Sequence, residues 1–493
     1  MLESSHAVPS SREEPRYAAV QGRSPPRRTA IASTNTLAAY MSREMPQRAQ
    51  RLIDAAKRVP VPEGTYAVGL GLLISGLTAY AFQILSFRGL SETDYTALNG
   101  LWIFVFVVAP GFFLPLEQEV SRAVADRRAR AIGGGPVVRK AAIAGIALTS
   151  SLIVLTLVCA AIFPLTERLF DDESVLLLCF LIALATYAVQ HLTRGTLSGN
   201  GRFGPYGMIL AVEGVVRVLP LIVLVAFGIE DLVWYGLALA VPPLIASLVA
   251  LRGQHHLVDP GPDAEWSELS TNLTLLFLGS LTAQALSYSA ALAAILLANG
   301  KAERELAADF IVGFFLARIP ILLFQAVQAA LLPKLAGLAG SGQHADFRSG
   351  LRKLVVIVVG IGALGVLGGI TIGPEVGKIL FGENFHLDRV DLGLLFAGSA
   401  AFILALTLAQ ALIALQGHGR ALVAWVVGLA CTIGVIAATA SSEFLDRAEY
   451  GFLAGCSAAA LTMLVLLLTR LRTATPESLS RLVEQIEHEP LEI

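Results

Sequence analysis

A few charged side chains of this sequence lie inside long apolar runs, away from the polar segments that separate the runs. Glu213 and Arg217 share one run, and Arg318 lies in another, two residues before Pro320. A charge at the centre of a membrane-spanning helix costs about 2.5–3.5 kcal/mol on insertion scales, so it usually faces a partner or a water-filled cavity. We therefore expect these residues to mark a binding cavity or a buried ion pair.

The first pair allows both interpretations. Glu213 and Arg217 are four residues apart, so a helix presents them on one face. They could line a cavity that binds an anionic headgroup or relays a cation. They could equally neutralise each other as a structural pair inside a lobe of the protein.

Arg318 has no acidic residue in helical register within its own run, and Gln325 and Gln328 continue a polar stripe beyond it. Pro320 cannot donate to the carbonyl of Leu316, and its ring bends the turn. Transporters use such broken helices to line a watery substrate path. The alternatives are that Arg318 pairs with a carboxylate on another helix or extends outward to the interface.

Uncharged polar side chains form two weaker candidate surfaces. One face of the seventh apolar run carries Ser280, Gln284, Ser287 and Tyr288, and the first run carries Tyr80 and Gln83. Polar faces of this kind serve helix packing as often as they line a cavity.

The elements that position these residues must be membrane-spanning helices. Apolar residues make up 55% of the chain and charged residues only 15%. A backbone in hydrocarbon has to satisfy its own hydrogen bonds, so each apolar run is expected to be helical. The runs predict about twelve spans, which begin near Thr65, Tyr95, Ala141, Ser174, Tyr206, Val233, Thr271, Asp309, Leu354, Asp391, Ala421 and Tyr450.

The two halves of the chain repeat the same landmarks. Pro115 precedes Gly199–Arg202 by the same interval at which Pro333 precedes residues 417–420. Between them, Phe163-Pro164 corresponds to Gly373-Pro374, with small insertions and deletions around each. We therefore predict an all-α protein of two lobes, each with about six helices, related by a parallel internal repeat.

The predicted organisation has five parts. Residues 1–62 lack an apolar run and are expected to form a disordered basic tail, of which the first forty fall away if translation starts at Met41 or Met45. The N-lobe follows in residues 63–251, a linker in 252–270, the C-lobe in 271–469 and a second tail in 470–493.

Several functions are not expected. The sequence lacks a phosphate-binding loop, a zinc helix, a nucleophile elbow and a paired carboxylate site, so we expect neither an enzyme nor a resident cofactor or metal. The net charge of −2 gives no reason to expect nucleic acid. The four cysteines lie within apolar runs, where thiols serve packing.

Four segments of the chain resemble the polysaccharide (Wzx-type) flippases of the multidrug/oligosaccharidyl-lipid/polysaccharide exporter superfamily. They are Arg318-Ile319-Pro320 and residues 331–335, 379–385 and 415–420, and the similarity extends over about residues 65–470. The resemblance implies alternating access between two six-helix bundles, with helices one, two, seven and eight around a central cavity. It also implies a polyprenyl-diphosphate-linked oligosaccharide as substrate, moved from the inner to the outer leaflet, with membrane lipids and possible polymerase or glycosyltransferase partners.

The resemblance also assigns roles to the polar residues. Arg318, supported by Arg217, is expected to bind the diphosphate, and Glu213 to hold Arg217. The remaining cavity residues, expected to meet sugar or water, are Gln284, Tyr288, Gln325 and Gln328. The coupling ion, a cation or a proton, is left open.

Three other functions stay possible at this point. A cation-coupled drug antiporter of the same superfamily is disfavoured because the first and seventh runs hold no Asp or Glu, which leaves Glu213 as the only deep carboxylate expected. Peptidoglycan-precursor flippases usually have more helices. A membrane scaffold would not need arginines within its spans.

The distribution of Lys and Arg predicts the orientation. If the N-terminus is in the cytoplasm, the connections on the inner side follow the second, fourth, sixth, eighth and tenth spans. These connections hold more Lys and Arg than those on the outer side, so both termini are expected in the cytoplasm. In an inner or plasma membrane, a cysteine introduced at Asp172 should then react with an impermeant thiol reagent added outside intact cells. Labelling that needs permeabilised cells would contradict this topology.

Overall fold

The computed structural model describes residues 65–269, 273–321, 324, 344–382, 385, 387–415 and 417–473. All of them belong to one compact unit, Glu63–Ile493. The predicted N-terminal tail, most of the C-terminal tail, and the candidate residues Gln325 and Gln328 lie outside the described residues.

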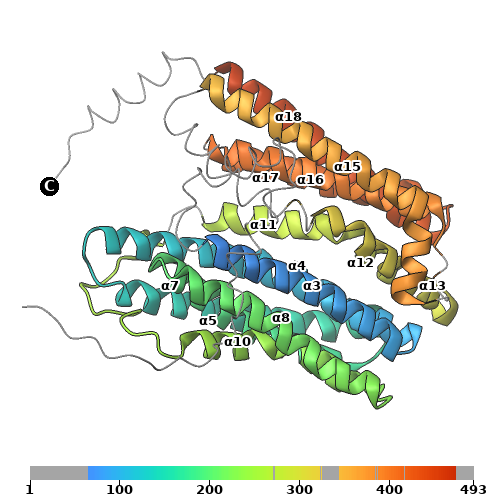
Figure 1. Ribbon diagram of the computed structural model, residues 1–493, viewed down its shortest axis with the longest axis horizontal. Helices are drawn as coiled ribbons and strands as arrows, with labels where there is room; N and C mark the ends of the chain where they lie inside the picture. Colours follow the sequence, from blue (N-terminus) through green and yellow to red (C-terminus); the bar gives the residue numbers. More distant parts are fainter. Residues whose placement is uncertain are drawn as a thin grey trace, which may run out of the picture. The chain divides into compact units, whose positions relative to one another are not determined.

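The described part of the chain is all-helical and has no strand (Figure 1). The helices of the N-lobe are α3 (Thr65–Gly89), α4 (Glu92–Ala129), α5 (Gly135–Ile162), α6 (Leu165–Phe170), α7 (Ser174–Gly199), α8 (Phe203–Ala226), α9 (Leu232–Ala240) and α10 (Pro242–Leu251). After the short helix η1 (Trp266–Glu268), the C-lobe contains α11 (Leu273–Ser287), α12 (Ser289–Leu297), α13 (Gly300–Ala317), α15 (His344–Phe381), α16 (Arg389–Ala414), α17 (His418–Ala438) and α18 (Phe444–Thr473).

Most of these helices can cross a membrane. Among the described residues, 10 helices are long and apolar enough, or up to 11 if α11 and α12, bent by 64°, count as one broken span. The predicted eighth span starts within α13 and runs on into residues outside the described ranges. Several helices begin before the predicted residue, as α4 does at Glu92, because helical hydrogen bonding continues past the apolar segment.

The internal repeat is visible in which helices pack together. In the N-lobe, α3 packs against α8, α4 against α7, and α5 against α7. The corresponding pairs of the C-lobe, in the same order, are α11 with α17, α13 with α16, and α15 with α16. The proline landmark, Pro164 in one lobe and Pro374 in the other, differs between the lobes. In the N-lobe the helix ends at Phe163-Pro164, between α5 and α6, whereas α15 continues through Pro374 to its end at Phe381.

Glycine allows the closest helix approach in the N-lobe. A Cβ atom built on Gly71 of α3 would lie 2.3 Å from the carbonyl oxygen of Gly207 on α8. Larger side chains at these positions would therefore push the two helices apart. Close packing of small residues is a main source of helix association in a bilayer, where burial of apolar surface between helices gives no net gain.

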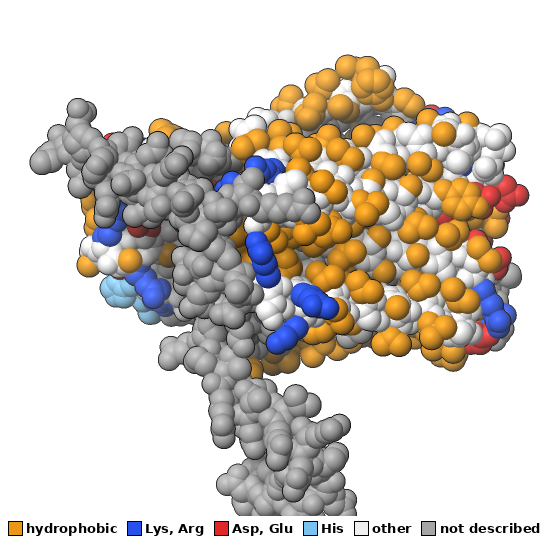
Figure 2. Space-filling model, turned by 90° about the horizontal axis from the view of Figure 1, so that it is seen from above, with side chains coloured by type: hydrophobic (Ala, Val, Ile, Leu, Met, Phe, Trp, Pro, Cys, Tyr) orange, Lys and Arg blue, Asp and Glu red, His pale blue; other side chains and the backbone are white. Residues whose placement is uncertain are grey.

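The outer surface fits an apolar solvent. One face is a broad apolar band, with most of the visible Lys and Arg side chains on one side of it and most Asp and Glu side chains towards the other (Figure 2). Large apolar side chains such as Leu364 and Leu219 are exposed on the surface of the molecule. Such an area would be a liability in water and is expected against lipid.

The two lobes meet mainly along α4, which contacts α11 and α13. We call the end with the α4–α5 and α7–α8 turns and the interlobe linker the linker end, and the other the opposite end. At the opposite end, Arg304 of the C-lobe pairs with Asp171 of the N-lobe at 3.0 Å. Arg168 donates to Asn299 Oδ1 at 3.0 Å, so polar contacts join the lobes there.

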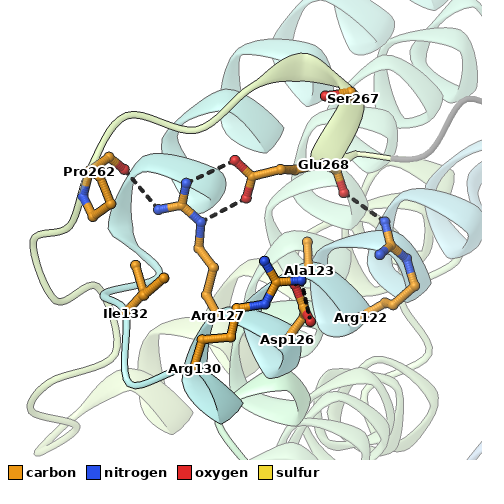
Figure 3. A pocket seen from close by; sticks show the side chains of 9 residues that line it. All are labelled: Arg122, Ala123, Asp126, Arg127, Arg130, Ile132, Pro262, Ser267 and Glu268. Carbon is orange, nitrogen blue, oxygen red and sulfur yellow. Dashed lines mark hydrogen bonds and ion pairs between the residues drawn. The ribbon is translucent and has the colours of Figure 1, made fainter. Parts of the chain in front are cut away.

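The linker is fastened to the N-lobe by Arg127 (Figure 3). Its guanidinium donates to both carboxylate oxygens of Glu268, at 2.8 and 2.9 Å, and to the carbonyls of Pro262, Asp263 and Gly133. The paired side chains surround a cavity of about 320 Å³. Arg202, at the repeated Gly-x-Gly-Arg motif, also bonds the linker, through Gln254 Oε1 at 2.9 Å.

The bond between Arg127 and Glu268 predicts a pH effect. Hydrogen bonds from Arg127 lower the pKa of Glu268 to about 2. The stabilisation from this carboxylate is therefore present above the usual Glu pKa of about 4.5, and is lost as the pH falls from there towards 2. Glu268→Gln should lower the hydrogen-exchange protection factors of the linker amides at neutral pH to the values that wild type reaches only in acid. Asp172→Asn, at the opposite end, is the control, and equal exchange in the Glu268 variant and wild type would contradict the fastening.

Candidate functional site

A cavity of about 130 Å³ lies where α3, α4 and α13 meet the break between α11 and α12. These elements correspond to helices one, two, eight and seven, which the resemblance predicts around the central cavity. The lining residues are Gly76, Ala79, Tyr80, Gln83, Trp102, Tyr288, Phe315, Arg318 and Ile321. The structure thus brings together the predicted residues Arg318 and Tyr288 with the weaker candidates Tyr80 and Gln83.

Arg318 is held by the ends of two broken helices. It caps α13 at its C-terminal end, where Pro320 follows. Its Nη1 donates to the carbonyl oxygen of Ser287 at 2.7 Å, and that carbonyl lies at the α11–α12 break. The guanidinium also lies 4.3 Å from the ring centre of Tyr288. This combination fixes the side chain while leaving other N–H groups for a ligand.

No carboxylate among the described residues lies within salt-bridge distance of Arg318. The nine lining residues also include no Asp or Glu. The guanidinium therefore gives the cavity a positive charge that only its aromatic walls and one carbonyl offset. An anion that entered the cavity would remove the cost of keeping this cation away from water.

Two further N–H donors on the cavity wall lack partners among the described residues. They are Nε2 of Gln83 and Nε1 of Trp102, both buried. Gln83 uses its Oε1 to accept from Tyr95, at 3.0 Å, which turns its amide nitrogen to the other side. A buried donor without an acceptor costs about 1–3 kcal/mol. A ligand rich in oxygen acceptors would satisfy both donors together with Arg318.

Glu213 and Arg217 are paired inside the N-lobe and do not line this cavity. Arg217 is only 2% exposed and binds Glu213 directly. Glu213 also accepts from Tyr187, at 3.0 Å, and from Gln190, at 2.9 Å. This geometry matches the interpretation in which Glu213 and Arg217 neutralise each other as a structural pair inside a lobe. Arg217 reaches the cavity only indirectly, because its guanidinium lies 5.4 Å from the ring centre of Trp102.

Gln284 lies near the cavity without lining it. It is half-buried on α11, and its carbonyl accepts the N–H of Tyr288 at 3.1 Å. Among the described candidate residues, the cavity therefore unites Arg318 and Tyr288 and leaves out Gln284, Glu213 and Arg217.

Glu213 is not the only deep carboxylate, as the sequence led us to expect, because the buried residues also include Glu117, Asp309 and Glu449. Glu117 contacts His191 Nδ1 at 2.7 Å and pairs with Arg194 at 3.2 Å. These partners come from α7, so no spacing within one helix marks them. A polar residue shortly after a proline in an apolar run was the available signal for Glu117.

Comparisons with known proteins agree with this architecture. No family model matches the chain. Two uncharacterized proteins of Mycobacterium tuberculosis are similar in sequence: one is 25% identical over 402 residues, covering 77% of this chain and 84% of that protein. The other is 26% identical over 401 residues, covering 78% and 88%.

Solved transporter structures share the fold. An inward-facing multidrug resistance MATE family transporter of the MOP superfamily superposes with a TM-score of 0.66 at 16% identity, covering 81% of this chain and 96% of that one. An outward-facing structure of that family gives 0.59 at 16%, covering 83% and 94%. A mutant of the Vibrio cholerae MATE transporter VcmN gives 0.61 at 17%, covering 84% and 98%. The chain therefore has the fold of these transporters.

Arg304 and Arg168 join the lobes at the opposite end, which the distribution of Lys and Arg predicts to face outward.

The two interpretations of the Glu213–Arg217 pair predict different effects of the same substitutions on stability and transport. Arg217→Ala leaves the charge of Glu213 buried without its cation, which should lower the free energy of unfolding by roughly 3–5 kcal/mol. The double variant Glu213→Gln, Arg217→Met should recover much of that loss. Thermal unfolding of the purified protein measures both effects. A stable Arg217→Ala protein that has lost transport would instead assign Arg217 to the substrate.

Proposed function

We propose that the protein is a flippase that moves a polyprenyl-diphosphate-linked oligosaccharide from the inner to the outer leaflet for export of a cell-surface polysaccharide. The observation that carries the proposal is the cavity around Arg318, which offers a cation and N–H donors but no lining carboxylate. The fold of known transporters and the resemblance of the sequence to polysaccharide flippases support it.

The chemistry of the cavity fits the polar part of such a lipid. A diphosphate has to leave bulk water to cross the bilayer, and charge-assisted hydrogen bonds are strong compensation for that loss. The guanidinium of Arg318 can bind two oxygens at once, which an ammonium group cannot do in the same geometry. Trp102 and Gln83 lie on the same wall and can donate to further phosphate or sugar oxygens.

An apolar groove beside the cavity supports a lipid-linked substrate. It has a volume of about 360 Å³ between α13 and α15 and begins at Leu316, Ile319 and Pro320, next to Arg318 in the chain. Gly365 and Gly369 of α15 line it without side chains. A polyprenyl chain in this groove would lie next to a diphosphate on Arg318, so one helix end would meet both parts of the substrate.

The mechanism follows from alternation between two states. In this mechanism the pairing of Arg304 with Asp171 keeps the lobes together at the opposite end, so the headgroup enters from the linker end. Separation of these contacts would let the lobes open at the opposite end and release the headgroup there. Packing of α4 against α11 and α13 has to yield in this step.

A second candidate function is antiport of a small cationic molecule. The fold of multidrug resistance transporters favours it. The buried carboxylates Glu117 and Glu449 also remove one argument against it. The cavity itself disfavours it, because a cationic drug would meet Arg318 and no lining acid. Peptidoglycan-precursor flippase activity uses the same diphosphate chemistry and differs in the attached sugar.

Arg318 variants test the proposal. Arg318→Ala should abolish glycan export, because the headgroup loses its cation, while the protein stays in the membrane at the native level. Arg318→Lys should restore only part of the export, since a point charge lacks the bidentate geometry. Export is measured by surface glycan, and trapped substrate by lipid-linked oligosaccharide in the inner leaflet.

Arg139→Ala removes an exposed arginine and is the matched control. Native export by Arg318→Ala at native protein level would make this arginine structural. Efflux of a cationic dye by the wild type, together with unchanged lipid-linked glycan in a deletion strain, would favour the antiporter.

A further inference from the structure

Glu449 is a buried carboxylate for which the proposed function has no use. It lies in α18 near the opposite end and is only 1% exposed. Neither of its carboxylate oxygens has a hydrogen-bond partner among the described residues. Glu213 in the N-lobe is the contrast, since it binds Arg217, Tyr187 and Gln190.

Among the described residues, the charged groups that act on Glu449 are acidic. Asp388 and Asp391 lie at the start of α16, and Asp446 precedes Glu449 by three residues on α18. Asp388 and Asp391 have a structural role, because they form a capping box at the first turn of α16. That role explains these two acids and leaves Glu449 unexplained.

The nearby Lys and Arg side chains in the described part of the chain are engaged elsewhere. Arg389 pairs with Glu375 at 3.5 Å, and Arg447 donates to the carbonyl oxygen of Ile436 at 3.2 Å. Of the other helices that contact α18, α11 and α12 contain no charged residue, and the charged residues of α17 lie in its first turn at the linker end. Helix α13 also meets α18 through the rings of Phe314 and Phe452, and the charged residues on either side of Phe314 are the buried acid Asp309 and Arg318 of the central cavity. An ionised Glu449 would therefore be buried, unpaired and close to like charges, which is a costly arrangement.

We propose that Glu449 is a proton-binding site, and that loss and uptake of its proton accompany the movement of the C-lobe. In the described state the carboxyl is neutral. When the opposite end opens to water, the proton leaves to solvent and the carboxylate gains hydration. When the end closes again, a proton from the same solution returns to the carboxylate.

The surroundings favour a proton over a metal ion. No group of three or more His, Cys, Asp or Glu side chains in the described part of the chain could hold a metal. A proton needs only one carboxyl group. The exposure of the acids also forms a gradient, from exposed Asp388 through half-buried Asp391 and Asp446 to buried Glu449. Hydrated carboxylates at the surface can pass protons inward along such a series.

A carbodiimide tests the site on the purified full-length protein without any substrate. Dicyclohexylcarbodiimide adds to protonated carboxyl groups in apolar surroundings, and mass spectrometry locates the adduct. We expect an adduct at Glu449 that decreases about tenfold between about pH 6 and about pH 9. Glu213 should stay unmodified, because its carboxylate is bonded to three donors.

Thermal unfolding and export provide the other two measurements. An ionised Glu449 is disfavoured in the folded protein, so the unfolding midpoint of the wild type should fall as the pH rises through the range in which the adduct disappears. Glu449→Gln, which imitates the neutral form, should abolish that fall, whereas Glu443→Gln, an exposed neighbour, should keep it. Export by Glu449→Gln should drop by about tenfold or more, since this side chain cannot release a proton.

Each outcome decides one part of the proposal. No adduct at Glu449 in folded protein, or one independent of pH, would overturn the proton site. A normal adduct with native export by Glu449→Gln would overturn its link to movement. Failure of the proposed substrate is separate, because it would show as native export by Arg318→Ala and leave labelling unchanged.

Discussion

The packing of α4 against the C-lobe is the interaction on which the rest of the architecture depends. This helix belongs to the N-lobe through α7 and contacts α11 and α13 of the C-lobe. Side chains along it contribute to the contacts at the opposite end, the cavity and the linker: Thr96 donates to the carbonyl of Arg304 at 2.9 Å, Trp102 lines the cavity, and Arg127 fastens the linker. A shift of α11–α13 along α4 would therefore change all three regions at once.

The lobes share a set of helix contacts but differ in how they treat buried charge. The N-lobe compensates its charges fully, with Glu213 on Arg217 and Glu117 on Arg194. Such pairs contribute little net stability, yet breaking one is costly, so they hold the helices in one arrangement. The C-lobe keeps Arg318 and Glu449 without salt-bridge partners among the described residues. The N-lobe thus neutralises its buried charges internally, whereas Arg318 and Glu449 of the C-lobe are left for a ligand or a proton to neutralise.

The sequence predicted the features that depend on local chemistry. Apolar runs indicated helices because lipid allows little else, and Pro320 indicated the end of α13 because proline cannot donate within a helix. Arg318 could be singled out for the same reason, since no acid shares its helical face. These inferences need only neighbours within one helix, which the sequence contains.

Contacts between side chains on different helices could not be predicted from neighbours within one helix. The spacing of Glu213 and Arg217 revealed the pair but not whether it faced the cavity, because that depends on how α8 is rotated against α4. The partners of Glu117 come from another helix, and the missing partners of Glu449 are a property of the whole C-lobe. Pro164 and Pro374 look equivalent in sequence, yet only the first separates two helices, since surrounding packing decides whether a helix tolerates the ring.

Trp102 gives the protein a built-in optical reporter. The chain has four tryptophans, and Trp102 is the one that lines the cavity between the lobes, with Arg217 5.4 Å from its ring centre. Trp234 and Trp266 are exposed, and Trp425 lies buried within the C-lobe. Indole emission depends on the polarity and charge around the ring, so the wavelength and intensity of Trp102 fluorescence should change when water or an anion enters the cavity. With the other three replaced by phenylalanine, its emission would follow the filling of the cavity in real time, without an attached dye.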